Sequence, residues 1–189
     1  KKYGSIKDIM MEYYENRLIT ITDDNDKELE DPVKFLQKKG YLAYVKTEEV
    51  KTDIVIELSE QEKNYLNTQL DLSDKFLYEL GENQNRNLCI LAQIIKYYKQ
   101  NKSIIVFACS LDHASFLNEM CSQKEIKSAS IDKNTTITSR RKYIENYKNG
   151  EIKVLFNFGV LTHGFDAPNT DIVIIARPTQ SPILYSQMI

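Results

Sequence analysis

Residues 103–114 read Ser-Ile-Ile-Val-Phe-Ala-Cys-Ser-Leu-Asp-His-Ala, and this stretch decides the fold class. The four side chains from Ile104 to Phe107 are all large and apolar, which is typical of a strand that is buried on both faces. Ser110 and Asp112 follow as candidate helix N-caps, and a helical pattern continues to Cys121. A strand that passes directly into a helix is the beginning of a βαβ unit.

Three more short apolar runs follow with the same character: Ser128–Ile131, Val154–Phe158 and Ile172–Ala176. A helical pattern from Ser139 to Tyr147, which Asn149-Gly150 ends, separates the first two of them. Another helix is expected from Asn87 to Tyr98, ahead of the first strand. Strands that alternate with helices predict an α/β fold with an open, mostly parallel sheet, right-handed crossovers and helices on both faces.

The first 85 residues follow a different pattern. Pro32 begins a short helix that Lys38-Lys39-Gly40 ends. Two β-rich stretches, residues 41–45 and 53–58, are expected to pair as a hairpin or to join a sheet edge. We therefore predict a smaller α+β connector over residues 1–85.

Helical periodicity resumes inside this connector. Ser59-Glu60-Gln61-Glu62 has the pattern of a helix start, and apolar positions continue in pieces to Leu80. Residues 81–87 are polar and are expected to break the helical pattern. The connector thus contains a β-hairpin and a helical insertion, and a second domain is predicted over residues 86–189.

Composition excludes several classes of protein. The 189 residues include 25 basic and 27 acidic side chains, a net charge of -2, so a histone-like polycation is excluded. With 42% hydrophobic and 28% charged residues, a globular and soluble chain is expected rather than a disordered one. No apolar run reaches the roughly 18 residues of a membrane span. Three cysteines without a C-x-x-C pair, and Lys1 at the start, predict a fragment of a longer cytoplasmic protein.

The common catalytic and metal-binding motifs are missing. The chain contains no G-x-x-x-x-G-K-[ST], G-x-G-x-x-G, G-x-S-x-G or H-E-x-x-H motif. Neither His113 nor His163 has a second ligand at metal spacing. A calcium loop that begins at Asp24 fails because Leu29 and Phe35 replace the required Gly and Glu. We expect no metal site and no catalytic centre built wholly within this chain.

Ligands of open α/β sheets bind beyond the carboxyl ends of the strands. The loop after the third expected strand contains Thr162-His-Gly-Phe-Asp166. A hydroxyl and a flexible glycine can bring backbone N–H groups to a phosphate oxygen, and a carboxylate can accept a ribose hydroxyl. Without its neighbours, however, a Gly-Phe-Asp loop is more often structural.

The order of the sequence blocks resembles the second motor lobe of superfamily 2 helicases. Residues 104–114 resemble motif IV of that superfamily, residues 162–166 its motif V, and residues 177–181 the segment that follows. The resemblance spans residues 87–189 and is strongest to the bacterial XPB-like proteins and the motor subunits of type I and III restriction enzymes. Residues 31–43 resemble, more weakly, the family's connector out of the first lobe.

This resemblance implies a RecA-like lobe without a P-loop of its own, together with a set of site residues. Gly164 and Asp166 would contact ATP. Five residues would contact the backbone of a nucleic acid: Ser110, Thr162, His163, Arg177 and Thr179. For Arg177 two roles stay open, which are binding a phosphate and tying the last two loops together.

The resemblance also limits what the chain does alone. The arginine fingers of the family belong to a G-R-x-x-R motif that would lie beyond Ile189, so no catalytic residue is expected here. ATP and Mg²⁺ would be bound mainly by the first motor lobe of the same protein, and the isolated fragment is expected to be inactive. The full protein would be an ATP-dependent helicase or translocase that hydrolyses NTP.

The expected partner is nucleic acid, with DNA favoured over RNA, and a nuclease or methylase partner is compatible with the restriction-enzyme resemblance. No membrane partner is expected. Two other functions remain open. One is a self-contained nucleotide-binding α/β domain, which the missing glycine fingerprints disfavour, and the other is a non-catalytic interaction module with a degenerate motor fold.

Overall fold

The computed structural model describes residues 27, 29, 31–52, 57–69, 71–159 and 167–188. Contacts within the chain divide it into two compact units, Lys1–Glu49 and Val50–Ile189, and each is described by itself.

In the first unit the described regular element is helix α2, Pro32–Lys38. Asp31 caps its N-terminus, since Oδ1 accepts a hydrogen bond from the Lys34 N–H at 3.0 Å. Gly40, at φ +78°, follows its end in the left-handed conformation that glycine adopts most easily. Both the start of this helix at Pro32 and its end before Gly40 are as predicted.

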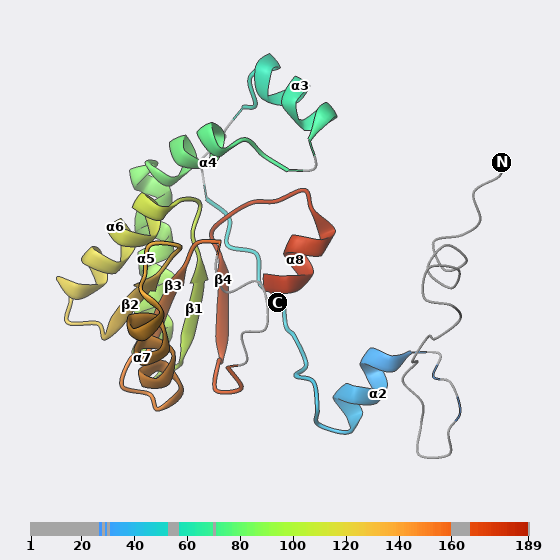
Figure 1. Ribbon diagram of the computed structural model, residues 1–189, viewed down its shortest axis with the longest axis vertical. Coiled ribbons are helices and arrows are strands. Elements are labelled where there is room, and N and C mark those ends of the chain that lie inside the picture. The colour runs from blue at the N-terminus through green and yellow to red at the C-terminus, as the bar shows by residue number, and fades with distance from the viewer. Residues whose placement is uncertain are drawn as a thin grey trace. The chain divides into compact units, whose positions relative to one another are not determined.

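The second unit is built around a four-stranded sheet with the order β2-β3-β1-β4 (Figure 1). The strands are β1 (Ile104–Phe107), β2 (Ser128–Ile131), β3 (Val154–Asn157) and β4 (Ile172–Ile175). All pairings are parallel: Ile104 lies opposite Val154 on one side and Ile172 on the other, and Ser128 lies opposite Val154. Each strand lies within the range predicted from its apolar run.

Helices cover both faces of this sheet, because alternate strand residues point to opposite sides. On one face Ile104, Val106 and Phe156 pack with α5 (Gln84–Tyr98) and α6 (Leu111–Ser122). On the other face Ile105, Phe107 and Leu155 pack with α7 (Ile137–Lys148) and α8 (Pro182–Met188). The predicted α/β class, with a parallel sheet between two helical layers, is confirmed (Figure 1).

Two short helices precede this core, α3 (Glu60–Thr68) and α4 (Asp74–Gly81). Ser59 and Ser73 cap their N-termini, each accepting a hydrogen bond from the backbone N–H three residues on. Leu77 and Leu80 of α4 are buried and pack against Cys109 at the carboxyl end of β1. The helical insertion therefore packs against the α/β core rather than being a separate body.

Two local predictions differ from the structure. Residues 41–45 form no strand with the described residues, and Tyr41 and Tyr44 are about three-quarters exposed. The proposed partner stretch lies mostly at residues 53–56, outside the described residues. The helical pattern does break within residues 81–87, but only at Glu82 and Asn83, because α4 reaches Gly81 and α5 begins at Gln84 with Asn83 as its cap. The predicted boundary between domains at residues 85 and 86 stays a prediction.

In the ranges that the structure covers, no helix is both long enough and apolar enough to cross a bilayer.

Gly81 of α4 packs closely against His113 of α6, and its replacement provides a test of this packing. A Cβ added at Gly81 would lie 3.0 Å from His113 Cβ and 3.2 Å from His113 Cγ. We expect Gly81→Ala to lower the free energy of unfolding by about 1–3 kcal/mol through overpacking, in spite of the higher helix propensity of alanine. Urea unfolding measures the free energy of unfolding, and Glu82→Ala, at the neighbouring exposed position, is the control. Equal stabilities of the two variants would contradict the close packing.

Candidate functional site

The parallel sheet brings four chain segments to one edge, since the carboxyl ends of parallel strands lie together. Residues 108–110 leave β1 there, Asp132 leaves β2, Phe158 leaves β3 and residues 176–177 leave β4. Two of the site residues predicted from the sequence, Ser110 and Arg177, therefore lie beyond the ends of neighbouring strands.

Ser110 is the N-cap of α6. Its Oγ accepts a hydrogen bond from the His113 N–H at 3.0 Å, and the residue is half-buried. The hydroxyl retains its own proton for donation to a further acceptor. Its predicted contact with a nucleic-acid phosphate stays a prediction.

His113 is a buried part of the same turn. Its Nδ1 accepts a hydrogen bond from the Cys109 N–H at 3.1 Å, and 1% of the residue is exposed. Burial, with a smaller contribution from the Arg86 charge, lowers the pKa of His113 to about 4. The imidazole is therefore neutral near pH 7 and holds the turn between β1 and α6, in agreement with a packing role rather than a metal-binding one.

Arg86 was missed by the sequence analysis, although it joins three elements at this edge. Its Nη2 donates to the Ala176 carbonyl oxygen at the end of β4, and its Nη1 lies 3.6 Å from Cys109 Sγ at the end of β1. The Cys109 thiol donates to the same carbonyl at 3.0 Å, and burial raises the pKa of that thiol. Arg86 thus ties α5 to the ends of both strands.

Arg177 forms an ion pair that neither sequence alternative included. Its Nη2 lies 2.8 Å from Oδ2 of Asp71, in the segment between α3 and α4. The side chain of Arg177 is 17% exposed and that of Asp71 is 23% exposed, so both charges are largely withdrawn from water. Arg177 therefore ties the loop after β4 to the helical insertion, while its predicted phosphate contact stays untested.

The Asp71 carboxylate also accepts a backbone hydrogen bond from the loop after β4. Asp71 Oδ1 accepts a hydrogen bond from the Gln180 N–H at 3.2 Å. Burial by itself would raise the pKa of Asp71, but hydrogen bonds from Leu72, Arg177, Gln180 and Thr179 outweigh it and hold the pKa below its usual value. Thr179, another predicted nucleic-acid contact, also accepts a hydrogen bond from the Ser181 N–H at 3.0 Å through Oγ1.

A hollow of about 490 Å³ adjoins this loop. Its lining combines apolar side chains of the helical insertion, Leu72, Phe76 and Leu80, with residues 177–180 and the guanidinium of Arg86. Two arginines therefore border a partly apolar surface at the carboxyl edge of the sheet. Such a surface suits a ligand that carries a negative charge and an apolar part.

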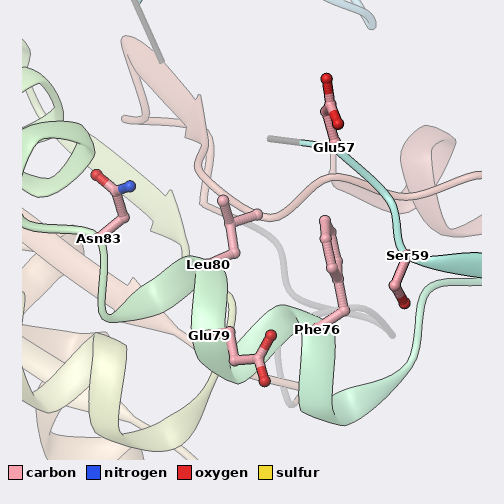
Figure 2. Close-up of a pocket in the computed structure, with 6 residues that line it drawn as sticks. All are labelled: Glu57, Ser59, Phe76, Glu79, Leu80 and Asn83. Atoms are coloured by element: carbon pink, nitrogen blue, oxygen red, sulfur yellow. The ribbon is translucent and has the colours of Figure 1, made fainter. Parts of the chain in front are cut away.

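A second hollow, of about 210 Å³, is also lined by Phe76 and Leu80 of α4. Figure 2 shows these two side chains projecting from α4 toward the segment that carries Glu57 and Ser59. Its charged lining residues are Glu57 and Glu79, both acidic. A polyanion would be repelled there, so this hollow is not part of the candidate site.

Four predicted site residues, Thr162, His163, Gly164 and Asp166, lie outside the described residues. Their expected contacts with ATP and nucleic acid therefore stay predictions. Across the residues that the structure does cover, no three His, Cys, Asp or Glu side chains converge on a metal position. At the described edge, Arg177 Nη1 is buried and has no hydrogen-bond partner among these residues.

With this geometry established, similarity to known proteins identifies the class. Residues 86–189 match the family model described as helicase conserved C-terminal domain. The match covers more than half of the chain, so the chain belongs to that family, and its parallel α/β sheet is the RecA-like fold of helicase C-terminal domains.

Two curated proteins are similar over about half of this chain. The chain is 35% identical over 94 residues to the "Putative ATP-dependent helicase IRC3" of Saccharomyces cerevisiae, covering 50% of this chain and 14% of that protein. It is 30% identical over 98 residues to the "51.5 kDa protein" of Lactococcus phage (isolate 7-9), covering 52% of this chain and 22% of that protein. The chain thus spans less than a quarter of the length of either relative.

Among solved structures, the crystal structure of the Pyrococcus furiosus Hef helicase domain is similar with a TM-score of 0.49 and 24% identity. It covers 59% of this chain and 24% of that chain. The structure of S. cerevisiae Dbp5 bound to RNA and ADP BeF3 is similar with a TM-score of 0.48 and 20% identity, over 54% of this chain and 28% of that chain.

The buried histidine predicts a pH dependence of stability. The pKa of His113 is about 4 in the folded protein and near 6.5 in the unfolded chain, so the unfolded state binds more protons as the pH falls below 6.5. We expect the free energy of unfolding to drop by about 2 kcal/mol between pH 7 and pH 5 from this residue. Urea unfolding at both pH values measures it. His113→Asn keeps an acceptor for the Cys109 N–H but cannot titrate, so its stability is expected to drop less; an identical drop in the variant would contradict the assignment.

Proposed function

We propose that this chain is the second motor lobe of an ATP-dependent nucleic-acid helicase or translocase. The observation that carries the proposal is the match of residues 86–189 to the helicase C-terminal domain family. The arrangement of Ser110, Arg177 and Thr179 beyond the carboxyl ends of β1 and β4 supports it, because that edge is where ligands of α/β sheets bind. The whole protein's activity and partners are part of this proposal.

The lobe's own residues would grip the sugar-phosphate backbone. Ser110 has a hydroxyl proton to donate, and Arg177 has a buried Nη1 without an acceptor in the described part of the chain. In the same loop the Gln180 N–H is a neutral donor, which Asp71 occupies here, and the Thr179 hydroxyl accepts from the Ser181 N–H while keeping its own proton to donate. Donors of this kind bind phosphates without reading base edges, so binding would be independent of sequence and sensitive to salt.

Motif V would complete this surface. Thr162 and His163 would contact the nucleic-acid strand, and Gly164 and Asp166 would face the nucleotide and touch the ribose. ATP, bound with Mg²⁺ mainly by the first motor lobe, supplies the free energy for closing and reopening the cleft between lobes. Arginine fingers from beyond Ile189 would complete the catalytic site, so the chain by itself would not hydrolyse ATP.

The finer assignment rests on resemblance. The sequence blocks favour the XPB-like and restriction-enzyme motor group, and with it DNA as the track and a nuclease or methylase as partner. RNA is the alternative track, because the solved structure of Dbp5, which has a similar fold, contains RNA. Stimulation of ATP hydrolysis by DNA or by RNA separates these two tracks.

The first test is ATP hydrolysis by the intact protein without polymer and with single-stranded DNA, duplex DNA or RNA. We expect one polymer to stimulate hydrolysis and Asp166→Ala to reduce the stimulated rate about tenfold, as for loss of one hydrogen bond to a charged group. Asp171→Ala serves as the matched control, since Asp171 precedes β4 at the opposite edge of the sheet. A folded protein that hydrolyses no ATP with any polymer would leave the non-catalytic interaction module as the better account.

A second test addresses the phosphate contact of Arg177. We expect Arg177→Met to weaken binding of DNA of any sequence by a similar factor and to lower the slope of log K against log salt by about 1, as for one lost phosphate contact. Arg177→Lys keeps the charge and is expected to retain most of the slope. Fluorescence anisotropy at several salt concentrations measures both, and an unchanged slope in Arg177→Met would show that Arg177 does not bind phosphate.

A further inference from the structure

Two donors of the loop after β4 converge on a single carboxylate. Arg177 Nη2 lies 2.8 Å from Asp71 Oδ2, and the Gln180 N–H donates to Asp71 Oδ1 at 3.2 Å. A guanidinium and a backbone N–H within four consecutive residues form a receptor for an oxyanion, and here the chain itself supplies the oxyanion.

The receptor is not saturated by a carboxylate. Arg177 Nη1 is buried and has no hydrogen-bond partner among the described residues. A carboxylate has two oxygens, and both already accept hydrogen bonds from this loop. A phosphodiester presents the same negative charge together with additional acceptor oxygens, which makes it a suitable replacement.

Asp71 comes from outside the part of the chain that matches the helicase family. It lies between α3 and α4, whereas the family match begins at residue 86. Glu62 braces this segment, since Oε1 accepts from the Ser73 N–H at 2.8 Å and Oε2 accepts from the Ser73 hydroxyl at 2.6 Å. Leu72 packs on the small core around Leu77. The helical insertion therefore holds the carboxylate in place beside the loop.

We propose that Asp71 is a built-in competitor of nucleic acid: its carboxylate occupies the oxyanion site of residues 177–180, and a backbone phosphate displaces it. The inference rests on the proposed function and deepens it by adding autoinhibition at the same site. Arg177 is largely buried, so removing Asp71 alone would leave an uncompensated cation. An exchange of one anion for another keeps the charge balanced. The helical insertion thereby tunes the affinity of the lobe for its track.

The test uses the intact protein with the substitution Asp71→Asn. Asparagine keeps the shape and an acceptor oxygen for the Gln180 N–H but removes the charge that pairs with Arg177. We expect the Kd for single-stranded DNA to fall roughly three- to tenfold. This change corresponds to an oxyanion site that Asp71 leaves unoccupied in about a third to a tenth of the wild-type molecules. We also expect the Tm to fall, because a largely buried ion pair is lost.

These opposite signs separate a competitor from a simple clamp. A clamp that only fixes the helical insertion would lower the Tm without strengthening binding. Binding is measured by anisotropy of a fluorescein-labelled single-stranded oligodeoxynucleotide and of its RNA counterpart, without nucleotide present. A fluorescent ATP analogue forms a third arm, since a nucleotide phosphate has the same chemistry as a backbone phosphate.

Asp171→Asn is the matched control. Asp171 pairs with Lys102 at 2.9 Å and accepts a hydrogen bond from the Ser103 N–H at 2.9 Å, so it has one cation and one backbone donor as Asp71 has. It lies just before β4, at the edge of the sheet opposite Arg177. This variant makes the same change of net charge and is expected to leave the Kd unchanged.

Each outcome supports the proposal, overturns it, or overturns the proposed function. Tighter nucleic-acid binding and a lower Tm in Asp71→Asn, with unchanged Kd in Asp171→Asn, support the proposal. Unchanged or weaker binding in Asp71→Asn overturns it while the proposed function stands, as does equal tightening in both variants or tightening for the ATP analogue alone. Binding of neither polymer by any version would instead overturn the proposed function. If Asp71→Asn does not fold, Asp71→Ser carries the same expectation.

Discussion

The second unit depends on the complete burial of β1. All four of its residues, Ile104–Phe107, are at most 6% exposed, and the strand is paired on both sides, with β3 and with β4. A buried backbone must have its N–H and C=O groups paired, so β1 requires both neighbours in register. Its two faces must also be covered, which explains why helices lie on both sides. This one strand therefore determines where the carboxyl edge lies and which loops meet there.

Local sequence patterns predicted this architecture well because each pattern reflects a local cause. The strands are apolar runs, and the capping residues Asp31, Ser59 and Ser110 lie where the sequence shows a short polar side chain before a helical run. Gly150, at φ +77°, follows the end of α7 as expected from Asn149-Gly150. Residues 41–45 have β propensity but form no strand with the described residues, since pairing is a tertiary property that propensity does not contain.

The candidate site was only partly predictable for the same reason. Ser110, Arg177 and Thr179 were found through resemblance, and they do lie at or beyond the ends of β1 and β4. Arg86 and Asp71 were not found, because their partners are distant in the sequence: Arg86 bonds to Ala176, and Asp71 bonds to Arg177 and Gln180. A lone charged residue in a polar segment has no local signal for such a contact. The ion pair between Asp71 and Arg177 emerges only when the helical insertion packs on the end of β1 through Leu77 and Leu80.

The two ion pairs at opposite edges of the sheet differ in a way that bears on function. Lys102 and Asp171 are 43% and 37% exposed, so water screens both charges and the pair contributes little beyond closing the edge. Arg177 and Asp71 are 17% and 23% exposed, and each would be costly to leave alone. The exposed pair can separate at low cost, because water solvates both charges. The largely buried pair separates at low cost only when another anion takes the place of Asp71 beside Arg177. The second pair is therefore the one suited to respond to a charged ligand, and it is the one placed at the edge where ligands of this fold bind.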